Sequence, residues 1–182
     1  MSIFNSVILQ TKESYTEVTD TATNQAEQLA EMFLKTSSKL ATAESCTGGG
    51  LAEILTRIPG SSTWFERGFV TYSNESKHEM LSVPLDTIEQ FGAVSEETAS
   101  AMAKGAIDNS RADYGVAITG IAGPDGGTES KPVGTVCFAW YKRNEGGNTA
   151  HICFDGDRLR VREQACMLAM QGLLDLLQKS AE

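Results

Sequence analysis

The sequence lacks long apolar runs, and this absence limits where the protein can work. No apolar run approaches the roughly 20 residues that a helix needs to cross a bilayer. The first ten residues have no basic region ahead of their short apolar stretch, which is not typical of a secretory signal. We therefore expect a soluble, cytoplasmic protein that does not associate with a membrane.

Positive charge is also scarce, because 24 acidic residues face 15 lysines and arginines and give a net charge of −9. Nucleic-acid binders gain much of their affinity by neutralising phosphates with basic residues. The longest basic cluster, Arg158, Arg160 and Arg162, is interrupted by Asp157 and Glu163. The charge balance therefore predicts no nucleic-acid partner.

Metal ligands and cysteine pairs are missing as well. The chain has four cysteines and two histidines, with no C-x-x-C pair and no zinc-like spacing. Cys137, Cys153 and Cys166 stand among apolar neighbours and are expected to be buried thiols. We predict no metal site, no cofactor and no disulfide framework.

The periodicity of apolar residues predicts a single α/β domain. Helices are expected over residues 22–34, 48–58, 74–81, 95–109 and 158–179, and strands over 40–43, 68–72, 114–119, 133–141 and 149–154. The continuous apolar run 114–119 is typical of a central strand, and residues 144–147 predict a hairpin. This order predicts a three-layer α/β/α sandwich on a mixed, mostly parallel sheet of about five strands. We expect residues 1–20 to form a loose extension and residues 21–182 to form the domain.

The segment Ala43–Gly50 (AESCTGGG) joins the end of a predicted strand to the start of a helix. Such a turn leaves backbone N–H groups unpaired at the positive end of the helix dipole. A hydroxyl placed there, that of Ser45, has the anion-stabilising surroundings that acyl transfer requires. The structural alternative is a helix cap in a tight turn, and on this segment alone the two interpretations are evenly matched.

A second strand-to-helix segment holds Tyr72 and Lys77, whose side chains could face one cleft. A serine nucleophile needs a proton acceptor, but neither His78 nor His151 has a convincing partner. A lysine can act as the proton acceptor if its pKa falls from about 10.4 to near neutrality, at a cost of about 4 kcal/mol. This hypothesis requires Lys77 to be shielded near Ser45; the alternative is a solvated lysine on a helix face.

Two further segments are candidates for substrate binding. Thr119–Gly127 (TGIAGPDGG) follows the most buried strand, where open α/β sheets bind ligands, but it matches neither a Walker A nor a G-x-G-x-x-G motif. Arg158 follows a turn at the start of the last helix and could bind a phosphate. It could equally pair with Asp155 or Asp157.

Together these segments resemble the CinA carboxy-terminal family, the PncC-type nicotinamide-nucleotide amidases. The matching segments follow the family order from about residue 28 to residue 177 and are Thr42–Gly49, Gly60–Glu75, Gly92–Ser95, Thr119–Gly127, Lys131–Val136 and Phe154–Arg158. The resemblance implies hydrolysis of the carboxamide of nicotinamide mononucleotide to nicotinic acid mononucleotide and ammonia, a salvage step in pyridine-nucleotide metabolism. It also implies catalysis without a metal.

The resemblance implies roles for individual residues. Ser45 is the expected nucleophile, with Lys77 and Tyr72 as the proton-transfer pair, and which of the two accepts the proton first stays open. The expected substrate contacts are the backbone amides of Thr47 and Gly48 as the oxyanion site, and Asn74, Thr119, Gly120 and Arg158.

Alternatives remain at both the residue and the protein level. Cys46 is a rival nucleophile, because thiols are intrinsically more reactive than hydroxyls. The chain could also be a non-catalytic nucleotide-binding paralogue, or an accessory protein of the competence and damage responses for which family members are named. Family folds of this kind tend to self-associate, so we expect a homo-oligomer.

Overall fold

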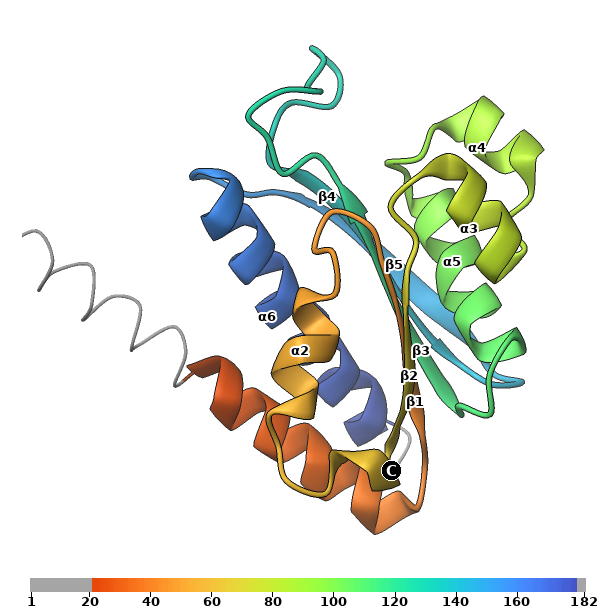
Figure 1. Cartoon of the computed structure of the whole chain (residues 1–182), viewed down its shortest axis with the longest axis vertical. Coiled ribbons are helices and arrows are strands. Elements are labelled where there is room, and N and C mark those ends of the chain that lie inside the picture. Colours follow the sequence, from red (N-terminus) through yellow and green to blue (C-terminus); the bar gives the residue numbers. More distant parts are fainter. Residues whose placement is uncertain (1–20, 180–182) are drawn as a thin grey trace, which may run out of the picture.

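A computed structural model describes residues 21–179 of the chain, so the predicted extension over residues 1–20 lies outside the described residues. Figure 1 shows the arrangement of the elements. In chain order they are a helix over residues 21–36, β1 (Leu40–Glu44), α2 (Gly50–Thr56), a 3-10 helix η1 (Ser61–Thr63), β2 (Phe65–Val70), α3 (Asn74–Leu81), α4 (Leu85–Phe91), α5 (Glu96–Asp108), β3 (Tyr114–Gly120), β4 (Thr135–Lys142), β5 (Gly146–Cys153) and α6 (Arg158–Lys179).

The five strands form one mixed sheet in the order β2-β1-β3-β4-β5. The strand β1 pairs in parallel with β2 and β3, whereas β4 pairs antiparallel with both β3 and β5. Four strands therefore point the same way and β4 runs against them. The predicted mixed sheet and the hairpin between its last two strands are confirmed.

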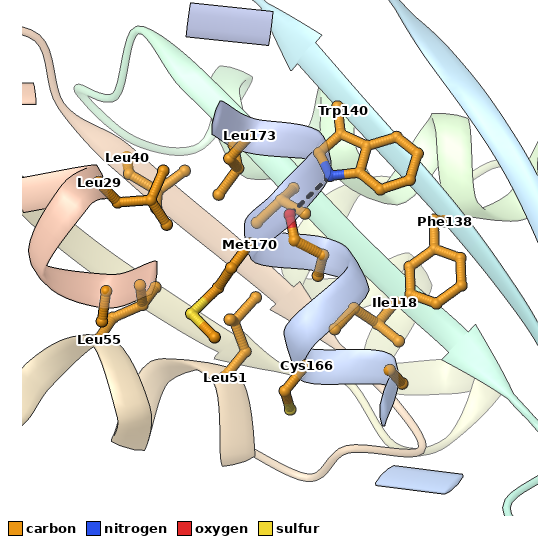
Figure 2. Packing of buried hydrophobic residues seen from close by; sticks show 14 of the residues in the cluster. Leu29, Leu40, Leu51, Leu55, Ile118, Phe138, Trp140, Cys166, Met170 and Leu173 are labelled. Atoms are coloured by element: carbon orange, nitrogen blue, oxygen red, sulfur yellow. Dashed lines mark hydrogen bonds between the residues drawn. The ribbon is translucent and has the colours of Figure 1, made fainter. Parts of the chain in front are cut away.

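Helices cover both faces of this sheet, which confirms the three-layer α/β/α sandwich (Figure 1). The helix over residues 21–36, α2 and α6 bury one core against the sheet, while α3, α4 and α5 bury another on the opposite face. Figure 2 shows part of the first core, where Met170 and Leu173 of α6 lie among aliphatic side chains. The indole of Trp140 also lies there and donates to the carbonyl oxygen of Ala169 at 2.8 Å.

Three details differ from the sequence prediction. Helix α4 was not expected, because only Ile88 of its seven residues is buried and the apolar period is weak. Strand β2 begins at Phe65 and ends at Val70, a few residues earlier than expected. Cys153 is exposed, since it lies on β5 at the edge of the sheet, whereas Cys137 and Cys166 are buried as predicted.

The carboxyl ends of three parallel strands meet at one edge of the sheet. Glu44 at the end of β1 lies beside Val70 of β2 and Ile118 of β3. Open α/β sheets bind ligands at such ends. The segments in which we predicted chemistry leave the sheet at this edge. Among the described residues, no helix is long and apolar enough to cross a membrane.

Candidate active site

The turn between β1 and α2 is held to the neighbouring strands by backbone hydrogen bonds. The Ser45 N–H donates to the carbonyl oxygen of Ile118 at 2.9 Å, so this residue continues the β1 ladder into the turn. Gly48 and Gly49 follow with φ angles of 58° and 90°, a left-handed conformation that glycine adopts readily. The chain therefore reverses immediately after Ser45, and the Ser45 side chain lies at the edge of the sheet.

A buried carboxylate fixes the start of α2, a role that the sequence prediction missed. Glu44 is fully buried, and its two carboxylate oxygens accept from the N–H groups of Leu51 at 3.0 Å and Ala52 at 2.9 Å. The Gly49 N-cap has no side chain to do this. Glu44 therefore supplies the acceptors that the first turn of a helix needs, and it lies directly next to Ser45.

Helix α3 presents Lys77 to this turn. Its N-terminus is fixed by a capping box between Ser73 and Ser76, and only 1% of Lys77 is exposed. The Lys77 Nζ lies 3.1 Å from the Ser45 Oγ and donates to the carbonyl oxygen of Thr71 at 2.9 Å. The structure thus brings together the hydroxyl and the shielded amine that the sequence hypothesis required.

Burial lowers the pKa of the Lys77 amine, because an ammonium loses hydration inside the protein. The carbonyl oxygens of Tyr72 and Ser73 also lie within 3.5 Å and 3.4 Å of Nζ. The Nζ therefore has the Ser45 hydroxyl and three backbone carbonyls as neighbouring acceptors. The neutral form of the amine, which burial favours, has a lone pair that can accept the Ser45 proton.

Tyr72 and Arg158 form a pair at the exposed side of the site. The Arg158 guanidinium donates to the Tyr72 hydroxyl at 2.7 Å and to the carbonyl oxygen of Gly123 at 2.8 Å, rather than to Asp155 or Asp157. The Tyr72 side chain is 58% exposed. Its hydroxyl is therefore paired with Arg158, whereas the amine next to Ser45 is that of Lys77.

A cavity of about 260 Å³ lies over these groups. Seven of the nine residues predicted for the site line it: Ser45, Tyr72, Asn74, Lys77, Thr119, Gly120 and Arg158. The sequence prediction missed three of the lining residues in particular. Ala93 and Val94 come from a distant segment, and Asp125 lies in the segment Thr119–Gly127, which was a candidate although Asp125 itself was not named.

Two predicted residues do not line the cavity. The Gly48 N–H already donates to the carbonyl oxygen of Ser45 at 3.0 Å, so in this structure it is not offered as an oxyanion donor. Thr47 is fully buried, and its carbonyl oxygen accepts from Arg162 at 2.8 Å. Cys46, the residue after Ser45, does line the cavity.

Cys46 is poorly suited to be the nucleophile. Burial raises the pKa of its thiol to about 12, because a thiolate would be desolvated there. Almost none of it would exist as thiolate at neutral pH. This finding argues against the rival interpretation and leaves Ser45 as the candidate.

Thr119 and Gly120 at the end of β3 have structural partners. The Thr119 hydroxyl donates to the carbonyl oxygen of Ala93 at 2.7 Å, so its proton is not free for a substrate. A Cβ at Gly120 would lie 2.7 Å from the carbonyl oxygen of Thr135. This position therefore requires glycine for the close approach of β4 as well as for the cavity.

The sequence matches the CinA C-terminal domain family over residues 22–177. The chain belongs to this family. Among its relatives, the nicotinamide-nucleotide amidohydrolase PncC of Escherichia coli (strain K12) is 53% identical over 148 residues, which are 81% of this chain and 90% of that protein. The protein of the same name from Pseudomonas putida is 49% identical over 162 residues, covering 86% and 98% of the two chains.

Solved structures of CinA proteins share the fold. The competence/damage inducible protein CihA from Agrobacterium tumefaciens superposes with a TM-score of 0.81 at 43% identity, covering 87% of this chain and 96% of that chain. A CinA superfamily protein from Escherichia coli gives a TM-score of 0.83 at 40% identity, covering 87% and 91%. The family fold therefore extends over the whole cavity.

Proposed function

We propose that this protein hydrolyses the carboxamide of nicotinamide mononucleotide, giving nicotinic acid mononucleotide and ammonia. Relatives with about half of their residues in common with this chain carry the name nicotinamide-nucleotide amidohydrolase. The observation that supports the chemistry is the contact of 3.1 Å between Ser45 Oγ and Lys77 Nζ at the floor of the cavity. A buried amine beside a serine hydroxyl is an arrangement that activates the hydroxyl.

Ser45 Oγ attacks the carboxamide carbon while its proton passes to the neutral amine of Lys77. The resulting ammonium then protonates the amide nitrogen, the C–N bond breaks and ammonia leaves. Water attacks the remaining ester with Lys77 again accepting the proton, and the Ser45 hydroxyl is restored. Lys77 is the acceptor in this scheme because its nitrogen is the one beside Ser45, while the Tyr72 hydroxyl lies with Arg158.

The negative oxygen of the tetrahedral intermediate needs donors at the start of α2. The backbone amide of Cys46 is suited to this role, since Cys46 lines the cavity and directly follows the nucleophile. The Thr47 amide remains a second candidate. Glu44 keeps these amides in place by binding the first turn of the helix.

The charged groups of the cavity fit a nucleotide with a cationic ring. Arg158 offers a planar cation that binds phosphate, and its contacts with Tyr72 and Gly123 hold it at the mouth of the cavity. Asp125 is the one carboxylate among the described lining residues, so we assign it to the positive pyridinium ring. Asn74 also lines the cavity and is proposed to contact the substrate.

Replacing the nucleophile tests this function. Ser45→Ala should abolish ammonia release from nicotinamide mononucleotide, because no oxygen remains to attack the carbon, and circular dichroism should show a native fold. Near-normal turnover by the folded variant would rule out the serine mechanism, and a wild-type protein that binds the nucleotide without releasing ammonia would indicate the non-catalytic paralogue. We also propose that the protein works in the cytoplasm and forms a homo-oligomer. Light scattering of the purified chain can test the oligomeric state.

A further inference from the structure

The segment between α4 and α5 is held in an unusual way, because every carbonyl oxygen from Phe91 to Val94 accepts from a side chain. Lys131 Nζ donates to the carbonyl oxygens of Phe91 at 2.9 Å and Val94 at 2.7 Å. The Gly92 carbonyl oxygen accepts from the hydroxyls of Ser95 at 2.9 Å and Thr98 at 2.8 Å. The Ala93 carbonyl oxygen accepts from the Thr119 hydroxyl at 2.7 Å. Three different parts of the chain therefore fix one four-residue segment.

Among the described residues, the Lys131 side chain joins this segment to the glycine-rich loop between β3 and β4 (residues 121–134). Ala93 and Val94 line the cavity on one side, and Gly123, Asp125 and Gly126 of the loop between β3 and β4 also line it. Lys131 lies farther along the same loop, where its N–H donates to the Thr128 hydroxyl at 3.0 Å. Its ammonium thus connects two lining segments that are far apart in the sequence.

Lys131 also lines a second cavity, which shares Val94 with the candidate active site. A neighbouring cavity of about 320 Å³ is lined by Phe91, Lys131 and Val94, and Val94 lines the candidate active site as well. The Lys131 ammonium lies against Gly92, where a Cβ would be in ordinary contact with Nζ at 3.5 Å. The position of Val94, and with it the shape of the substrate cavity, therefore depends on the Lys131 contacts.

We propose that Lys131 is a positioning residue for substrate binding, which holds the Phe91–Val94 segment against the glycine-rich loop. The proposal rests on the proposed function for its substrate. Lys131 does not contact Ser45 or Lys77, which are placed by β1 and α3. Loss of Lys131 should therefore weaken ground-state binding and leave the chemical step nearly intact.

The experiment compares Lys131→Met, which keeps the length of the side chain but cannot donate, with Lys131→Arg, which can donate to both carbonyls. Lys104→Met is the control, because Lys104 is an exposed lysine that pairs with Asp108 on the outer surface of α5. KM and kcat for nicotinamide mononucleotide are measured for all four proteins. Hydrogen–deuterium exchange of residues 92–95 and 123–131 provides a readout that does not depend on activity.

Lys131→Met should raise KM about tenfold and change kcat less than about twofold, as expected for the loss of charge-assisted hydrogen bonds to one wall of the site. Exchange in both segments should become faster while β1 stays protected. Lys131→Arg should restore KM in part, and Lys104→Met should match the wild type. An unchanged KM with unchanged exchange in Lys131→Met, or a loss confined to kcat, would overturn the proposal.

A wild-type protein without turnover would instead contradict the proposed function. The exchange comparison would still decide whether Lys131 holds the two segments together. If Lys131→Met does not fold, Lys131→Arg with slow exchange and a KM near that of the wild type would support the role. Exchange of residues 92–95 and 123–131 that is as fast as in unstructured chain, in the wild type as well as in Lys131→Arg, would contradict it.

Discussion

The floor and the rim of the candidate site differ in how they are built. On the floor, Ser45, Glu44 and Lys77 are buried and their polar atoms have protein partners at the ends of strands and the start of helices. On the rim, Tyr72 and Arg158 are exposed and come from loops and from the first residue of α6. On this difference we base the proposal that the floor performs the reaction and the rim selects and holds the substrate.

The strongest test of this division replaces Lys77 by methionine, which has a similar size but no amine. Activity should fall about a thousandfold, as for loss of a general base, while KM changes little. Because burial lowers the pKa of Lys77, the folded state binds fewer protons than the unfolded state below the ordinary value of 10.5. The free energy of unfolding of the wild type therefore falls as the pH is lowered toward neutrality. Lys77→Met lacks this contribution, because methionine does not titrate.

Urea unfolding at pH 7 and pH 9.5 measures this difference. Lys77→Met should be more stable than the wild type at pH 7, and its advantage should shrink as the pH approaches the ordinary pKa of lysine. An active Lys77→Met protein would contradict the role of the floor. An advantage that grows with pH would show that the buried amine is charged.

A smaller effect is expected at the rim. Arg158→Lys keeps the positive charge but cannot donate in the same geometry to both Gly123 and Tyr72. KM for nicotinamide mononucleotide should rise about tenfold with little change in kcat. Nicotinamide riboside, which has no phosphate, is the matched control substrate, and its kinetic constants should be the same for both proteins. An equal loss with both substrates would assign Arg158 to something other than the phosphate.

The smallest effect is expected for Cys46, which follows the proposed nucleophile Ser45 but whose thiol we expect to take no part in the reaction. Cys46→Ser should keep activity within about twofold, since burial raises the pKa of the thiol to about 12 and leaves it unreactive. In the native protein a thiol reagent should modify the exposed Cys153 and spare the three buried cysteines. Inactivation that follows modification of Cys46 would revive the rival nucleophile.

On both the floor and the rim, the sequence identified residues near strand ends and helix starts, where local signals are strong. A strand followed by AESCTGGG predicts a tight turn into a helix, and the structure has this turn between β1 and α2. The proximity of Lys77 to Ser45 was required by the lysine hypothesis, and the family resemblance favoured it over a solvated lysine. The buried cap by Glu44 was missed, since it depends on the path of the turn.

Long-range contacts account for most of what could not be predicted. The bonds from Lys131 to Phe91 and Val94 join residues about forty positions apart, and nothing in either segment indicates its partner. Thr119 was expected to contact the substrate, and the sequence did not indicate that its hydroxyl donates to the carbonyl oxygen of Ala93. Helix α4 could have been found, because Pro84 before it and Gly92 after it are typical helix boundaries.

The two tryptophans of the chain lie on the same side of the sheet. Trp64 stacks on Phe33 with ring centroids 5.6 Å apart, and Trp140 stacks on Phe138 at the same spacing, both within the core formed with α2 and α6. The core beneath α3, α4 and α5 contains no tryptophan among its described residues. Intrinsic fluorescence would consequently follow the melting of one half of the sandwich, and loosening of the half that carries Lys77 would go unseen by this probe.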